Sequence, residues 1–124
     1  MNRTMEGDPV VDACLFCRIV ADEIPSTRVH EDDEVIAFRD IAPRAPTHIL
    51  VIPRRHIASA ADLTDADGPL LGRLFGVTAT VARDQGIADD GYRVVTNVGR
   101  WGGQTVDHLH LHLMGGRPFV WPPG

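Results

Sequence analysis

His108-Leu-His-Leu-His-Leu113 is the stretch of sequence that says most about how this chain folds. Histidine and leucine alternate with a period of two, which is the period of a β-strand. In a strand over residues 107–114, all three imidazoles would lie on one face and the leucines on the other. The leucine face belongs in a core, whereas the histidine face carries groups that can each donate, accept or hold a proton near neutral pH.

Three interpretations of this histidine row remain open from the row alone: a plain polar face, a catalytic zinc site, or an anion pocket. A single zinc ion is disfavoured, because His108 and His112 would be about 13 Å apart at about 3.3 Å per residue. In an anion pocket, one neutral imidazole attacks phosphorus while its neighbours position the phosphate and the leaving group. The glycine-rich stretch Gly99–Val106 favours the pocket, since its backbone can turn closely around a ligand and aim N–H groups at oxygens.

Composition narrows the function classes further. The 124 residues fit one domain, and all 12 basic residues are arginine, which excludes lysine Schiff-base and P-loop chemistry. A formal net charge of −5 without a basic run argues against partners such as nucleic acid or an anionic membrane. The sequence has no apolar run long enough to span a membrane and no secretory signal, so we expect a cytoplasmic protein.

The pattern along the chain predicts a largely antiparallel α+β domain. Residues 1–11 are expected to form a flexible arm, and 12–124 a single domain. One short helix is predicted over 13–22 with Asp12 as its cap, and one long helix over 69–85 behind Asp67. Five strands are predicted, at 28–30, 35–39, 48–52, 92–98 and 107–114.

The histidine row also carries a family resemblance. His108-Leu-His110-Leu-His112-Leu-Met114 matches the signature of the histidine-triad (HIT) superfamily, in which histidine alternates with apolar residues. Nearly the whole chain from Cys14 onward resembles this family, with further matches at Ile24-Pro25, Phe38–Ile41, Ala45–His48, Val51–Pro53, Arg55–Ile57 and Gly103–Val106. Gly115-Gly-Arg117 and the ending Trp121-Pro-Pro-Gly124 resemble the histidine-triad nucleotide-binding (Hint) branch rather than the dinucleoside polyphosphate hydrolases.

The resemblance implies a dimerising HIT-like fold, with an antiparallel sheet of about five strands, one long helix and one short helix. It further implies hydrolysis of purine nucleoside 5'-phosphoramidates, including aminoacyl and lysyl adenylates, through a covalent nucleotidyl-histidine. By position, His110 would be the nucleophile, and His112 would contact the phosphate and the leaving group. His48 and His108 would support the histidine network, and the chemistry would need no cofactor.

The same resemblance implies the contacts to a purine nucleotide such as AMP or GMP. Asp40 and Ile41 fall where the family binds ribose. The positions that would hold phosphate are Asn97, Gly103, Gln104 and Thr105. Threonine at 105 replaces the usual serine and keeps its hydroxyl. Trp121 would reach the active site of the neighbouring subunit in a homodimer.

Cys14 and Cys17 suggest a second site. Three residues apart on a helix, they share a face, and with His56 and His108 they could close a tetrahedral Cys₂His₂ zinc site. Buried structural thiols are the alternative. The resemblance implies a structural zinc ion, because some bacterial relatives with this Cys-x-x-Cys carry one. His30, beside an acidic turn, is expected to be a surface residue.

Two other functions remain open beside the phosphoramidase. A purine-nucleotide-binding or regulatory HIT protein without catalysis would use the same pocket, and a dinucleoside polyphosphate hydrolase would use the same nucleophile. A zinc hydrolase built on the histidine strand is disfavoured by the spacing of the three imidazoles.

Overall fold

The fold is described from a computed structural model, in which residues 13–124 are described. The expected flexible arm at 1–11 and the expected cap Asp12 lie outside these residues. The regular elements follow one another as α1 (Leu15–Val20), β1 (Arg28–Glu31), β2 (Val35–Arg39), β3 (Thr47–Pro53), α2 (Gly68–Asp84), β4 (Arg93–Val95) and β5 (Leu111–Gly115). Two single 3₁₀ turns, Ala60–Asp62 and Asp65–Asp67, precede α2 and were not predicted.

The five strands form one sheet in the order β1-β2-β3-β5-β4, and every neighbouring pair is antiparallel. The predicted α+β class with five antiparallel strands, one long helix and one short helix is therefore confirmed. β3 and β5 pair at the centre, with Leu50 opposite His112 and His48 opposite Met114. This register brings histidines from two strands that are distant in sequence onto neighbouring positions.

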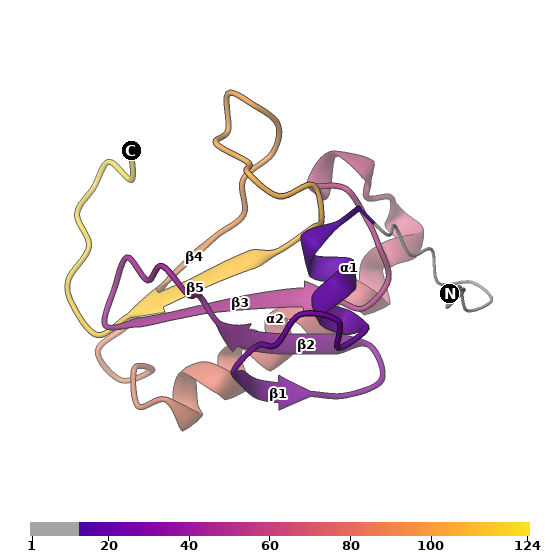
Figure 1. Ribbon diagram of the computed structural model, residues 1–124. Helices are drawn as coiled ribbons and strands as arrows, with labels where there is room; N and C mark the ends of the chain where they lie inside the picture. The colour runs from indigo at the N-terminus through magenta and orange to yellow at the C-terminus, as the bar shows by residue number, and fades with distance from the viewer. Residues whose placement is uncertain (1–12) are drawn as a thin grey trace.

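The two helices lie on opposite faces of the sheet (Figure 1). α2 covers the face that carries Ile49 and Val51 of β3, and the three leucines of the histidine row join this core. α1 lies over the other face, where Leu50 and Ile52 point. The alternation of side chains along each strand thus separates a leucine core under α2 from a histidine layer under α1.

α2 agrees with its prediction within a residue at each end. Asp67 stands at the N-cap and Pro69 in the first turn, where a missing N–H costs nothing. Leu74, Val77 and Val81 are buried along one stripe, as their spacing predicts.

α1 is shorter than the predicted helix over 13–22. It spans only Leu15–Val20, and its N-cap is Cys14, whose sulfur accepts the N–H of Cys17 at 3.3 Å. The predicted C-terminal extension is wrong, because the chain leaves the helix through Asp22, which has a φ of 63°. A thiol of the candidate metal site therefore also defines where the helix begins.

The last two strands are also shorter than predicted. β4 ends at Val95 rather than 98, and β5 begins at Leu111 rather than 107. The backbone N–H of Leu109 donates to the carbonyl of Ile57 at 2.6 Å, outside the sheet. His108 and His110 consequently stand on an extended segment before the strand, although they keep the alternation of faces.

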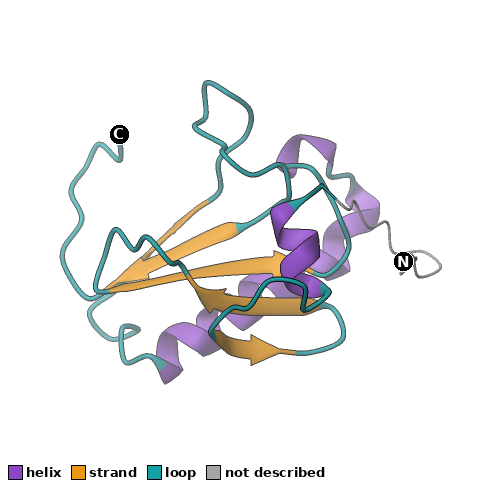
Figure 2. Ribbon diagram, in the orientation of Figure 1, coloured by secondary structure: helices purple, strands orange, loops and turns teal. Residues whose placement is uncertain are grey.

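Two irregular segments stand out from the sheet, namely the connection between β4 and β5 and the tail that follows β5 (Figure 2). Neither belongs to a helix or strand, and both contain positions that the family resemblance assigns to nucleotide binding. Within residues 13–124, no helix has the length and apolar character needed to cross a membrane.

Candidate functional site

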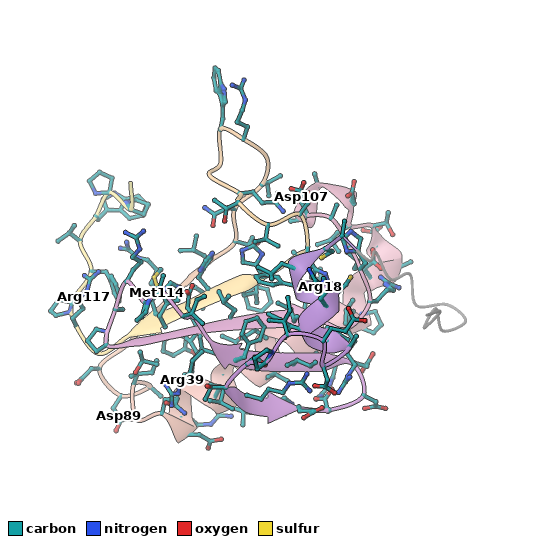
Figure 3. All side chains as sticks on the ribbon, in the orientation of Figure 1. Arg18, Arg39, Asp89, Asp107, Met114 and Arg117 are labelled. Atoms are coloured by element: carbon teal, nitrogen blue, oxygen red, sulfur yellow. The ribbon has the colours of Figure 1, made fainter. Side chains whose placement is uncertain are left out.

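The histidine row lies under α1, between that helix and the end of β3. Asp107 marks the start of the row close to α1, and Met114 lies toward the far end of β5 (Figure 3). His108 has no exposed surface, and His110 is 4% exposed. The ring of His110 packs against those of His112 and Phe16, at centroid distances of 4.9 Å and 5.1 Å. Two of the three imidazoles are thus buried and His112 is half-buried, so the row is not a solvent-facing polar surface.

Hydrogen bonds fix the tautomer of His110. Its Nδ1 lies 2.7 Å from the backbone carbonyl of His108. A carbonyl oxygen only accepts, so Nδ1 must carry the proton and donate it. The lone pair of the neutral ring therefore resides on Nε2, which is the state that an imidazole nucleophile requires.

A second chain of hydrogen bonds fixes His48 and His112. The backbone N–H of Arg44 donates to Nδ1 of His48 at 3.0 Å, so the proton of neutral His48 is on Nε2. The Nε2–H of His48 donates to Nδ1 of His112 at 2.9 Å. Oδ2 of Asp40 lies 3.5 Å from this Nε2 of His48. Neutral His112 is left with its proton on Nε2, as a donor.

The electrostatics keep His112 neutral in the free protein. Burial lowers the pKa of His112 to about 4, and the neighbouring His110 and His48 add to the effect while Asp40 opposes it. Burial likewise lowers the pKa of His48. A bound phosphate would place negative charge beside His112 and favour its protonated form.

A cavity of about 240 Å³ opens beside His110 and His112. Its walls are mainly apolar and include Phe16 and Phe38, which suits a flat, weakly polar ligand such as a nucleobase. Polar groups gather where the histidines lie, with Asp40 and Thr105 among the residues that line the cavity. Ile41 also lines it and is almost fully exposed. The structure therefore brings Asp40, Ile41, Thr105, His110 and His112 together.

Three other expected phosphate contacts lie in the connection between β4 and β5 and brace that loop. The side-chain amide of Asn97 donates to the carbonyl of Gly102 at 2.7 Å. The amide of Gln104 donates to Ala58 and Val106 and accepts the N–H of Gly99. Gly103 turns the chain with a φ of 82°, and a Cβ at Gly102 would overlap the carbonyl of Val98. These residues shape the loop that presents Thr105, and none of their side chains lines the cavity.

Trp121 lies apart from the cavity of its own chain. It is 84% exposed on the tail that leaves the end of β5 (Figure 1). His30 is also away from the site, where its Nε2 pairs with Asp32 at 2.7 Å in the acidic turn. Its placement agrees with the expectation of a residue outside the site.

Cys14, Cys17, His56 and His108 converge on one point, with all four donor atoms within 4.8 Å of one another. Nδ1 of His108 lies 3.4 Å from the Cys14 sulfur and 3.6 Å from that of Cys17, while Nδ1 of His56 lies 3.3 Å from Cys17. Zinc–sulfur bonds of about 2.3 Å and zinc–nitrogen bonds of about 2.0 Å place these atoms about 3.5 Å apart in a tetrahedron.

The chemistry of the four groups also fits a cation. Nε2 of His108 donates to the carbonyl of Pro53 at 2.9 Å, which leaves the lone pair of Nδ1 facing the two sulfurs. Burial lowers the pKa of His56, and it lowers that of His108 to about 4, so both rings are neutral near pH 7 as metal ligands must be. We refer to these four residues as the Cys₂His₂ cluster.

Comparison with known proteins agrees with the fold and with the histidine row. The family model of the HIT domain matches residues 21–119 of this chain. The chain belongs to the HIT family. The purine nucleoside phosphoramidase of Escherichia coli K12 is 49% identical to this HIT protein over 109 residues, which cover 88% of the chain and 92% of the relative.

Solved structures of HIT proteins share the fold throughout. A HIT family hydrolase from Legionella pneumophila has a TM-score of 0.88 at 51% identity, covering 90% of this chain and 99% of that one. A HIT family hydrolase from Clostridium thermocellum has the same TM-score at 44% identity, covering 90% and 96%. A histidine triad nucleotide-binding protein from Candida albicans has a TM-score of 0.75 at 32% identity, covering 89% and 83%.

Several residues that line the cavity were not predicted from the sequence to be site residues. Phe16 and Ile19 fall within the short helix predicted over 13–22, and Leu50 falls within the strand predicted over 48–52, with no site role given to any of them. All three face the histidine layer because α1 and β3 meet there. The apolar periodicity of these segments predicts burial, but it contains no signal that distinguishes a cavity wall from a closed core.

The stability of the HIT protein should depend on pH through His112. Its pKa is about 4 when folded, against about 6.5 in an unfolded chain, so unfolding takes up a proton between these values. The stabilisation is complete above pH 6.5 and declines as pH falls toward 4, by up to about 1.4 kcal/mol per pH unit. Urea unfolding at pH 7, 6, 5 and 4.5 should show a shallower loss for His112→Gln than for the wild type. Equal slopes for the two proteins would contradict this assignment.

Proposed function

We propose that this HIT protein hydrolyses purine nucleoside 5'-phosphoramidates through a covalent intermediate on His110. The observation that carries the proposal is the hydrogen bond from Nδ1 of His110 to the carbonyl of His108, which leaves Nε2 as the nucleophile at the cavity. The 49% identity to the Escherichia coli purine nucleoside phosphoramidase supports the same reaction.

In the first step, Nε2 of His110 attacks phosphorus, a new P–N bond forms, and the P–N bond to the amine breaks. The departing nitrogen takes a proton from protonated His112, because an amine leaves far more readily than its anion. The phosphate of the bound substrate favours that protonated state of His112. The imidazole of His110 becomes positively charged, and its Nδ1–H bond to the His108 carbonyl strengthens as a charge-assisted hydrogen bond.

In the second step, water attacks the nucleotidyl-His110 and releases a nucleoside monophosphate. His112, neutral after the first step, takes the proton of the attacking water as the bond between phosphorus and Nε2 of His110 breaks. His110 becomes neutral again, and His112 releases its added proton to solvent once the nucleotide has left. In the free protein His48 orients neutral His112 by donating its Nε2–H to Nδ1 of His112, so it acts as a positioning residue. His108 positions His110 in the same sense through its carbonyl.

The cavity suggests how the nucleotide is oriented. The base would lie against Phe16 and Phe38, the ribose would meet Asp40 and Ile41, and the phosphate would lie between Thr105 and the histidines. Asn97, Gly103 and Gln104 support phosphate binding by shaping the loop before Thr105. The substrate would thus be purine-containing, consistent with the named activity of the Escherichia coli relative.

Replacement of His110 should separate binding from turnover. His110→Ala removes the nucleophile and leaves Asp40, Phe38 and the rest of the cavity, so turnover of adenosine 5'-phosphoramidate should fall below detection. Titration with AMP, followed by calorimetry, should show nearly unchanged affinity. His30→Ala is the matched control, since it removes a histidine outside the site and should keep full activity. Near-wild-type turnover by His110→Ala would refute the covalent mechanism.

The same assays distinguish the other functions. Tight AMP binding by a wild-type protein without turnover would indicate a purine-nucleotide-binding or regulatory protein. Faster cleavage of a dinucleoside polyphosphate than of any phosphoramidate would indicate that class of hydrolase. Turnover by the zinc-loaded protein without any covalent adduct on histidine, abolished by chelation in a protein that stays folded, would indicate a zinc hydrolase.

We also propose that the Cys₂His₂ cluster binds a structural zinc ion. Its donor atoms have the separations of a tetrahedral site, and both histidines offer a lone pair at Nδ1. When bound, the ion would tie α1 to the segment before β5, and it would not touch the reacting phosphorus. The proton transfers described above run through imidazoles alone.

Metal analysis tests this proposal. Protein purified without added zinc should contain one zinc ion per chain, and Cys17→Ser should contain much less. Removal of the ion should lower the melting temperature, since ligand binding to the folded state alone stabilises it. Ser59→Ala is a suitable control, because it removes a small polar side chain outside the cluster and should keep the ion. A wild-type protein without bound metal would contradict the proposal.

The protein is further proposed to be a cytoplasmic homodimer in which the tail reaches the partner's site. Val120 and Trp121 are adjacent large apolar residues and both are exposed, so together they offer an apolar patch that supports contact of the tail with another subunit. Phe119, in contrast, packs beside the guanidinium groups of Arg117 and Arg93, which anchors the tail where it begins.

Shortening the tail should alter specificity more than folding. Deletion of 119–124, or Trp121→Ala alone, should change the ratio of kcat/KM between an aromatic and a small-amine phosphoramidate, with little change in melting temperature. Deletion of 123–124 keeps Trp121 and is the matched control. Light scattering of each variant reports whether a dimer persists. An unchanged kcat/KM ratio in both tail variants would count against a role of Trp121 in recognising the leaving group.

A further inference from the structure

The segment that carries His110 lies outside the sheet ladder. β5 begins at Leu111, so residues 108–110 must be held by other contacts. The N–H of Leu109 donates to the carbonyl of Ile57 at 2.6 Å, and the hydroxyl of Thr96 donates to the carbonyl of His110 at 2.8 Å. Ile57 directly follows His56, so the hydrogen bond from Leu109 ends at a residue next to the Cys₂His₂ cluster.

His108 connects that cluster to His110 within a single residue. Its ring is held by the Pro53 carbonyl on one side and by the sulfurs of Cys14 and Cys17 on the other. Its own carbonyl accepts Nδ1–H of His110 at 2.7 Å. The same residue thus carries a ligand atom of the cluster on its side chain and, on its backbone, the acceptor that selects the tautomer of His110.

Phe16 makes a second connection. It lies between the two cysteines on α1, and its ring meets that of His110 edge to face with centroids 5.1 Å apart. A helix of six residues is too short to be stable alone, and the Cys14 sulfur caps this one. The contacts of the two cysteine sulfurs with His56 and His108 therefore also keep Phe16 packed against His110.

We propose that the Cys₂His₂ cluster is a positioning element for His110. Its metal-bound form holds His110 as the Nδ1–H tautomer with Nε2 available at the cavity, through the His108 carbonyl and the Phe16 ring. Loss of the metal allows the ring to populate the Nε2–H tautomer as well, in which the nucleophilic lone pair is absent. The inference rests on the proposed role of His110 and on the proposed zinc ion, and it gives that ion an effect on catalysis without any contact to substrate.

The tautomer of His110 can be observed directly by nitrogen NMR. Protein labelled with ¹⁵N in its histidine rings is compared at pH 7.5 with zinc bound and after chelation, with assignment of the His110 signals from His110→Ala. We expect a single Nδ1–H form with zinc and a mixture of the two tautomers without it. His48 is the internal reference, because the backbone N–H of Arg44 sets its tautomer independently of the cluster.

A kinetic comparison tests the consequence. Cys17→Ser should lower the single-turnover rate of nucleotidyl transfer by at least about tenfold, since misplacing a reacting group by about 1 Å can cost about 100-fold. Its affinity for AMP should change little. Leu74→Ala is the matched control, because Leu74 is fully buried under the opposite face of the sheet and its truncation lowers stability without touching the cluster. It should keep the wild-type rate below its melting temperature.

Identical His110 tautomers with and without zinc would overturn the proposal, as would an equal loss of rate in Leu74→Ala. If Cys17→Ser does not fold, the chelated wild-type protein decides. A chelated protein that unfolds completely would also overturn it, since the cluster would then be a requirement of the fold. The NMR result is independent of turnover, so a protein without phosphoramidase activity but with a zinc-dependent tautomer would refute only the proposed function.

Discussion

The hydrogen bond from Nδ1 of His110 to the carbonyl of His108 is the constraint on which the rest of this site depends. This hydrogen bond determines which ring nitrogen of His110, a residue that is 4% exposed, keeps its lone pair. The same His108 donates from its ring to Pro53 and faces two sulfurs, so its three polar contacts leave it little freedom. The buried residue His108 thus contacts the sheet, the candidate metal site and the candidate nucleophile His110.

The proposed phosphate site contains few side chains that are permanently charged. The chain has no lysine and a net charge of −5, and the imidazole of His112 is neutral before a ligand arrives, with a pKa of about 4. Positive charge would develop only when a phosphate enters beside His112 and when His110 becomes covalently modified. Preorganised donors of this kind stabilise the negative charge that develops in the transition state.

The sequence predicts the faces of the fold better than the partners of each residue. The alternation in residues 108–113 correctly predicts that the leucines lie in the core and the histidines on the other face. The four residues predicted to form a zinc site, Cys14, Cys17, His56 and His108, do lie together in the structure. The start of β5 could not be predicted, because it depends on where Leu109 finds its acceptor. The bracing role of Gln104 depends similarly on Ala58, which is 46 positions away. Periodicity reports a side chain's face, whereas these outcomes depend on contacts made only in the folded chain.

The most direct measurement is the site of covalent modification during turnover. Protein mixed with adenosine 5'-phosphoramidate is quenched within milliseconds in alkaline denaturant, which preserves a phosphorus–nitrogen bond to histidine, and is digested for mass spectrometry. We expect an adenylyl group on His110 that forms and decays at the rate of turnover. Turnover without any adduct, or an adduct on another residue such as His112, would contradict it.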